Sequence, residues 1–176
     1  GTVKGNRLAV NDTESGMRLE QGELAADIAD NRLQLRRFVF VSPHQPLPRP
    51  LRQRLGDAAA AQAAPGKLEV TGSIAIDPAS NDGQANLDVN LERVGVRQRP
   101  DQWLNLSGQG KLSWQQAALG LRGQLAVDAA WWQMAPAGAP RLSDDVIVQR
   151  PGQKVAASVR PRLDLDLEIG LGRHFL

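Results

Sequence analysis

The sequence predicts an all-β protein whose strands pair as successive antiparallel hairpins. Apolar and polar residues alternate along most of the chain, most regularly in RLDLDLEIGLG (162–172), and strand side chains alternate between faces in the same way. Clusters of Asn, Asp, Gly and Pro separate these segments, as turns require. Rings are few, with four Trp, three Phe and no Tyr, which disfavours a compact sandwich filled by large aromatic side chains.

The first hairpin has its turn at Asp30-Asn31, between alternating segments at residues 19–28 and 33–40. Each segment changes its apolar phase once, near Gly22 in the first and at Arg36-Arg37 in the second. A β-bulge, in which one strand carries an extra residue, is the simplest explanation at Arg36-Arg37.

Residues 42–66 interrupt the strands. Four prolines within eight positions (43–50) exclude a strand in the middle of a sheet, because proline has no N–H to donate. The Ala-rich part from Leu51 to Ala64 forms either a short helix or a disordered segment. We expect 42–66 to be a mobile loop or helix excursion between two parts of the sheet.

Two cleaner hairpins follow. The first joins residues 68–76 and 85–91 across a turn at 77–83, and a second change of phase comes at Glu92-Arg93. After a turn at 99–101, the second hairpin joins residues 104–114 and 119–127. A Pro/Gly-containing loop at 135–145 precedes the final strand at 163–171. These patterns predict an antiparallel sheet throughout.

Glycines occupy four positions on the apolar phase of these hairpins: Gly72, Gly108, Gly110 and Gly123. A glycine at such a position either permits a tight bend of the sheet or leaves a hollow for a ligand. We favour the bend, and the two outcomes are compatible.

Trp131-Trp132 cannot both face inward on a regular strand, so we expect one ring to be exposed or rotated by a bulge. Anchoring at a lipid headgroup region is one explanation for such a pair. Packing against a neighbouring loop is the more common one.

The composition excludes several classes of function. The net charge is only +2, from 21 Lys plus Arg and 19 Asp plus Glu, and the basic residues are scattered, which argues against nucleic-acid binding. The chain has no Cys, and its two histidines, His44 and His174, are far apart, so we expect no zinc site. No apolar run approaches the roughly 20 residues that span a bilayer as a helix.

The remaining polar motifs predict no catalytic site and no cofactor. Asp164, Asp166 and Glu168 share one strand face about 6–7 Å apart, which is typical of a solvated face rather than a calcium loop. Asp144-Asp145 is interpreted as the entry to a strand. Gly108-Gln109-Gly110 begins like a phosphate-binding fingerprint, but no helix is predicted after it. We therefore do not expect an enzyme.

The C-terminal part resembles the TamB family of envelope proteins of Gram-negative bacteria. The resemblance rests on RLSDDVIVQRPG (141–152) and RPRLDLDLEIGLGRHFL (160–176), where 142–148 is similar to a conserved loop element and Leu171-Gly172 to an LG step. The alternating patterns at 19–35 and 72–91 are also similar to this family, so the resemblance covers nearly the whole chain.

The resemblance implies that residues 1–176 form a single segment of a longer, inner-membrane-anchored protein that crosses the periplasm. It implies a sheet folded lengthwise into an open apolar groove (a β-taco) and a TamA-like outer-membrane partner of the Omp85 class. The implied function is to shield phospholipid acyl chains during transport from the inner to the outer membrane. The segment itself is not expected to span a membrane.

Two alternatives remain open. In one, the segment is a scaffold that handles nascent strands of outer-membrane barrels and autotransporters through edge pairing and apolar contacts. In the other, it is a closed sandwich or solenoid spacer without a ligand. For the groove we expect lipid or hydrophobic substrate strands to contact the apolar phase: Leu68, Val70, Ile74, Ile76, Leu87, Val89, Leu91, Leu104, Leu106, Leu112, Leu119, Leu121, Leu125, Val127, Leu163, Leu165, Leu167 and Ile169.

Overall fold

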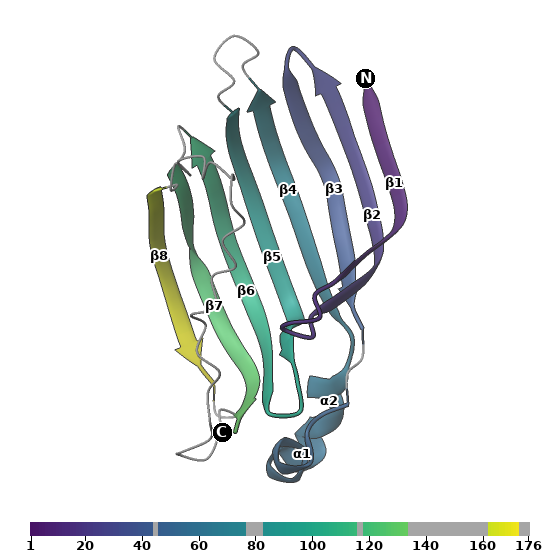
Figure 1. Ribbon diagram of the computed structural model, residues 1–176, viewed down its shortest axis with the longest axis vertical. Helices are drawn as coiled ribbons and strands as arrows, with labels where there is room; N and C mark the ends of the chain where they lie inside the picture. The colour runs from purple at the N-terminus through teal and green to yellow at the C-terminus, as the bar shows by residue number, and fades with distance from the viewer. Residues whose placement is uncertain (44–45, 77–82, 116–117, 134–161, 173–176) are drawn as a thin grey trace, which may run out of the picture.

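The protein forms one eight-stranded, curled sheet that is not closed, with its strands in sequence order (Figure 1). The computed structural model describes residues 1–43, 46–76, 83–115, 118–133 and 162–172. The predicted all-β fold is confirmed. The strands are β1 (Thr2–Asn11), β2 (Arg18–Ala29), β3 (Arg32–Ser42), β4 (Gly66–Ile76), β5 (Gly83–Gln98), β6 (Gln102–Gln115), β7 (Ala118–Trp132) and β8 (Arg162–Leu171).

The predicted hairpins have the expected register. In β4 and β5, Leu68 faces Leu91, and in β6 and β7, Trp114 faces Leu119. The phase change at Arg36-Arg37 corresponds to a register shift between β3 and β4, and the change at Glu92-Arg93 to a shift between β5 and β6. Both shifts occur where an extra residue is inserted, so a bulge explains each one.

The last strand corrects the prediction of an antiparallel sheet throughout. β8 pairs with β7 in parallel, from Ala118 opposite Arg162 to Val127 opposite Leu171, without a register shift. Period-two alternation is the same in parallel and antiparallel strands, so the pattern carries no information about direction. Parallel neighbours need a long connection, and residues 133–161 provide one.

β1 was not predicted, because the expected elements begin only at residue 19. Its sequence, TVKGNRLAVN, has few large apolar residues and contains two register shifts against β2. Arg7 lies at the irregular part of the strand with a positive φ of 57°. The bulges break the alternation from which the other strands are recognised.

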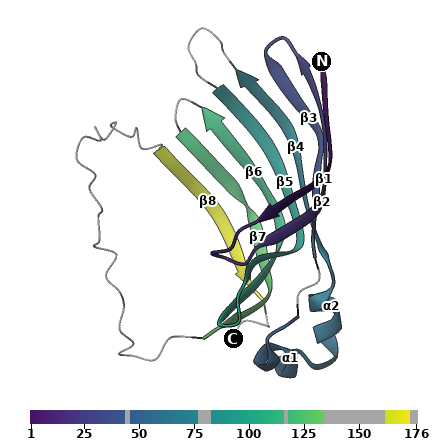
Figure 2. The same ribbon diagram turned by 45° about the vertical axis from the view of Figure 1, so that its right-hand side comes forward.

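The excursion is helical in its Ala-rich part, which is one of the two predicted alternatives. It contains α1 (Arg49–Leu55), a 3-10 turn (Gly56–Ala58) and α2 (Ala59–Ala63), with Pro50 in the first turn of α1. Three leucines at intervals of four residues, Leu47, Leu51 and Leu55, pack against Trp103 and Ala129 of the sheet. Leu51 is 0 % exposed. The helices lie at one end of the strands (Figure 2).

Two glycines allow the strands to approach each other unusually closely. Gly72 has φ +136° and Gly108 has φ +146°, values that side-chain-bearing residues rarely adopt. A Cβ atom would lie 2.1 Å from the backbone oxygen of Asn86 at the first position and 2.2 Å from that of Gln124 at the second. Close backbone approach therefore explains the glycines at these two positions, and the choice between a bend and a hollow stays a prediction.

Candidate functional site

The predicted apolar residues come together on one face of the sheet. Cross-strand partners share a face, so the register alone places them in rows that run across the strands. One row contains only leucines: Leu87, Leu112, Leu121 and Leu165 of β5 to β8. Neighbouring rows are Ala85, Trp114, Leu119 and Leu163; Val89, Gly110, Gly123 and Leu167; Leu91, Gly108, Leu125 and Ile169; and Val94, Leu106, Val127 and Leu171.

The remaining predicted residues lie on the same strands. Leu104 precedes Leu106 by two residues on β6, and Ile74 pairs with Ala85. Ile76 pairs with Gly83, although its side chain lies outside the part that the structure describes.

On the side of β1 to β5, the protein's own side chains fill much of this face. Leu19, Phe40 and Val94 form one buried cluster, and Leu68 and Leu91 pack against it. A second cluster joins Ala26, Leu35 and Val70, with Leu87 and Val89 at its border. The predicted residues in β4 and the adjoining part of β5 therefore contribute to the internal core.

On the side of β8, nothing among the described residues covers the same face. Leu163, Leu165 and Ile169 are 58 %, 55 % and 53 % exposed, and Leu171 is 68 % exposed. Most apolar side chains of β6 and β7 are half-buried. These exposed side chains lie on one strand and continue the apolar rows of β5 to β7, and an exposed apolar surface is typical of a site that binds an apolar partner.

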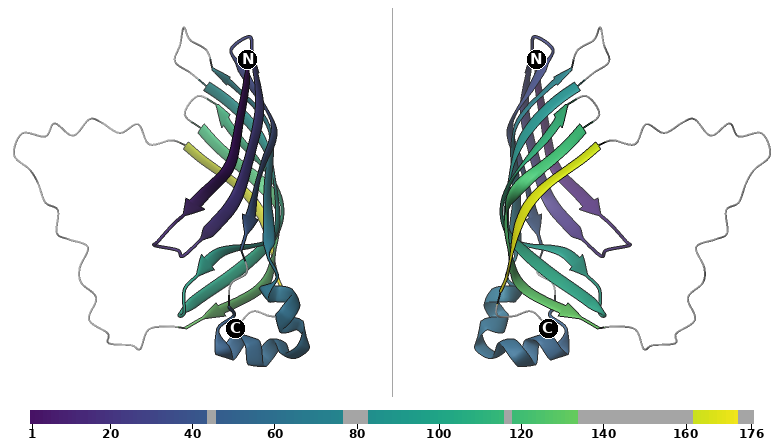
Figure 3. Two further views of the ribbon diagram at one scale, coloured as in Figure 1. Left: turned by 90° about the vertical axis from the view of Figure 1, so that its right-hand side faces the viewer. Right: turned by 90° about the vertical axis from the view of Figure 1, so that its left-hand side faces the viewer.

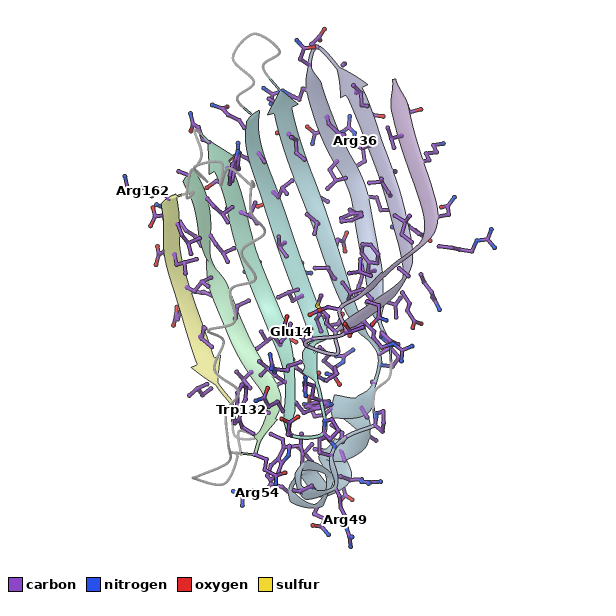
Figure 4. The ribbon with its side chains drawn as sticks, in the orientation of Figure 1. Glu14, Arg36, Arg49, Arg54, Trp132 and Arg162 are labelled. Atoms are coloured by element: carbon purple, nitrogen blue, oxygen red, sulfur yellow. The ribbon has the colours of Figure 1, made fainter. Side chains whose placement is uncertain are left out.

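The turn between β1 and β2, residues 12–17, closes one end of the apolar face. It lies on the same side of the sheet as the β5–β6 turn and on the opposite side from the helices (Figure 3). The Gln98 N–H donates to the Ser15 carbonyl at 2.9 Å, and the Arg99 guanidinium donates to the Glu14 carbonyl at 3.2 Å. Glu14 accordingly lies in front of the sheet in Figure 4. The apolar face is thus covered at this end of the strands.

The opposite face is polar and solvated. Lys111 lies 3.5 Å from Asp88, and Arg122 lies 4.0 Å from Asp164, and all four side chains are well exposed. Such surface pairs contribute about 0–1 kcal/mol each. Asp164, Asp166 and Glu168 are exposed on this face, as expected for a solvated strand. Among the described residues, no cluster of His, Cys, Asp or Glu is arranged to hold a metal ion.

A hollow of about 500 Å³ lies on this polar face rather than on the predicted apolar one. Charged and amide side chains of β4 to β7 form its walls, including Glu69, Asp88, Lys111 and Gln124. The hollow lies among polar-phase residues on the outside of the sheet, so it is not part of the predicted apolar face.

The tryptophan pair divides as predicted. Trp131 packs against the cluster of the helical excursion, and Trp132 is 47 % exposed. The Arg97 guanidinium carbon lies 5.8 Å from the centre of the Trp132 ring. Trp132 lies at the same end of the sheet as Arg49 and Arg54 (Figure 4).

One titratable group was missed in the sequence. Burial raises the pKa of Asp128 above its usual value, while a hydrogen bond from Ser107 and the charge of Arg93 oppose part of this increase. The Ser107 hydroxyl donates to Asp128 Oδ2 at 2.6 Å and accepts from the Arg93 N–H at 2.9 Å. The three residues belong to three strands, so no local motif identifies them.

Several predicted features fall outside the described residues. These are His44, His174, Asp144-Asp145 and the whole 141–152 motif. In the part of the chain that is described, no helix is long and apolar enough to cross a membrane. No protein-family model, curated protein or solved structure matches the chain. The TamB resemblance therefore rests on the quoted motifs alone.

Proposed function

We propose that the apolar face shields phospholipid acyl chains while they cross an aqueous compartment. The observation that carries the proposal is the continuity of the face, which runs through the leucine row from Leu87 to Leu165 and ends in exposed side chains on β8. The opposite face is charged and needs no cover. An open face of this kind accommodates a chain that enters and leaves along the sheet.

The energetics suit transport better than tight binding. Burying one methylene contributes about 0.8 kcal/mol, so two chains of roughly 16 carbons gain on the order of 20 kcal/mol relative to water. A bilayer provides nearly the same gain. A half-open apolar face therefore keeps lipid out of water without trapping it, and the direction of transport has to come from another source.

The TamB resemblance supports the cellular setting that we propose. The chain would act in the periplasm as a segment of an inner-membrane-anchored protein, together with an Omp85-class outer-membrane barrel. Its role would be non-catalytic and independent of cofactors. The motifs that carry this part are the alternating segment 160–172 and the element at 142–148.

The outer edge of β8 supports a second candidate, a scaffold for nascent barrel strands. Within the described residues, β8 pairs only with β7, so its other edge has backbone groups available for a further strand. An incoming strand would place apolar residues beside Leu163 and Leu165. Basic residues on its other face would suit Asp164 and Asp166.

Site-specific photo-crosslinking in cells tests the two candidates. A crosslinking residue at Leu165 or Leu121, which face each other on the apolar side, is expected to capture phospholipid in the full-length protein. The matched controls are Asp166 and Arg122, which also face each other, one residue further along on the polar side.

Three outcomes separate the alternatives. Lipid at the two leucines and not at the controls supports the acyl-chain proposal. Protein adducts at Leu165 without lipid support the strand scaffold. Equal labelling of both faces, or none at either, contradicts both and leaves the spacer function.

A further inference from the structure

A small, buried polar cavity lies between the helical excursion and the sheet. It has about 10 Å³ of space for the centre of a water molecule. Its lining includes Gln62 of α2, Arg93 and Gln98 of β5, and Trp103 and Asn105 of β6. Trp103 is 2 % exposed and Asn105 is 5 % exposed, so the cavity is sealed on the side of β6.

Hydrogen bonds determine how the amides in this cavity are oriented. The Asn105 Nδ2 group donates to the backbone carbonyl of Gln62 at 3.2 Å, so the Asn105 side-chain oxygen must point the other way. That oxygen accepts from Gln98 Nε2 at 2.9 Å. Gln98 Oε1 is therefore an acceptor without a donor. Exchanging the oxygen and nitrogen of this amide would not help, because it would place the Gln98 oxygen against the Asn105 oxygen.

Four buried atoms of residues that line the cavity have no hydrogen-bond partner among the described residues. Two are acceptors, Gln62 Oε1 and Gln98 Oε1, and two are donors, the Arg93 Nε–H and the Trp103 indole N–H. Buried polar atoms without partners are rare in folded proteins, because each one loses its hydration without compensation. Finding four in residues that line one cavity indicates a shared ligand.

We propose that one water molecule binds in this cavity. Water donates two hydrogen bonds and accepts two, which matches the two acceptors and two donors, and the cavity has room for one. A cation would be repelled by Arg93 and would leave the indole N–H unsatisfied. An anion would leave both amide oxygens unsatisfied. The water therefore joins α2 to β5 and β6.

This water also supports the closed end of the apolar face. Gln98 contributes its side chain to the cavity and its backbone N–H to the Ser15 carbonyl of the β1–β2 turn. One residue thus connects the helices on the polar side of the sheet with the turn that covers the apolar side. A water bound at Gln98 Oε1 restricts the position of this connection.

Water–protein NOE and ROE spectra of the ¹⁵N-labelled chain test the proposal. The indole N–H of Trp103 is expected to show a water cross-peak whose sign indicates a residence time longer than that of surface hydration water. The exposed indole of Trp132 should show only short-lived hydration. Gln62→Leu removes one acceptor but keeps the Gln62 carbonyl that binds Asn105, so the Trp103 cross-peak should fall to the level of Trp132.

Gln53→Leu is the matched control, because Gln53 is an exposed glutamine of α1 and the chemical change is the same. It should leave the Trp103 cross-peak unchanged. Two results would overturn the proposal. The first is a Trp103 indole that shows NOEs to protons beside a protein acceptor, for example at residues 44–45, instead of to water. The second is a water cross-peak that Gln62→Leu does not change. If Gln62→Leu fails to fold, the wild-type spectrum alone decides between water and a protein acceptor.

Discussion

Replacing Leu51 by alanine tests whether the helical excursion is part of the core. Leu51 is 0 % exposed and packs in a cluster with Leu55, Trp103 and Ala129. The substitution removes three buried carbons, about 2.4 kcal/mol at about 0.8 kcal/mol each. The cavity left behind brings Leu→Ala substitutions to about 2–5 kcal/mol. Because a short helix at the end of the sheet can partly collapse into the cavity, we expect a loss of about 2–3 kcal/mol.

Urea denaturation followed by tryptophan fluorescence measures this loss, since Trp103 lies in the same cluster. In a chain of this size, about 2–3 kcal/mol corresponds to a decrease in Tm of about 4–12 °C. Arg52→Ala, at the next position of α1 and exposed, is the control and should change stability by less than about 0.5 kcal/mol.

Limited trypsin digestion gives a second measurement for Leu51→Ala. A packed helix should protect Arg52 and Arg54 in the wild-type protein, and the variant should be cut there first. Equal stability of Leu51→Ala and Arg52→Ala would refute the packing, as would rapid cleavage of the wild-type protein at these arginines. Either result would restore the expectation of a mobile excursion.

Three further predictions concern the sheet. The pKa of Asp128 is raised in the folded state, so the contribution of its protonated form to stability is present at acidic pH and is lost as the pH rises through the pKa of the folded protein. In urea titrations, the stability of Asp128→Asn relative to wild type should therefore increase from pH 3 to pH 7. Gly108→Ala should cost about 1–3 kcal/mol through its positive φ and the contact with Gln124, while Gly170→Ala, with its nearest atom at 3.7 Å, should cost less than half as much in the same titrations. Leu165→Arg should leave the Tm within a few degrees of wild type, whereas Val94→Arg, at a site that is 2 % exposed, should abolish cooperative unfolding. Equal effects of the two substitutions would show that the apolar face is not open at β8.

The hairpins and two bulges were predictable from the sequence because they are local. Asp30-Asn31 takes positive φ at both residues, as a tight hairpin turn requires, and this pair stands out in the sequence. The phase changes at Arg36-Arg37 and Glu92-Arg93 are visible because each shifts a regular alternation by one residue. Each of these features depends on a few neighbouring residues.

The features that were missed depend on residues far apart in the chain. The packing of Leu51 on Trp103 joins the excursion to β6, and its only local sign is the spacing of Leu47, Leu51 and Leu55. β8 runs parallel to β7, and the alternation of side chains is the same in parallel and antiparallel strands. The environment of Asp128 similarly combines three strands.

The apolar phase is uniform in sequence, but in the structure its residues have two different roles. Val70 and Val94 are buried within the protein, while Leu165 and Ile169 on β8 are more than half exposed. Alternation reports which side of a strand is apolar and does not report what covers it. Val94 packs with Leu19 and Phe40, and Val70 packs with Ala26 and Leu35, whereas the exposed part of the face lies on β8. A ligand of this sheet should therefore be sought beside β8, where apolar-phase residues remain more than half exposed in the part of the chain that the structure describes.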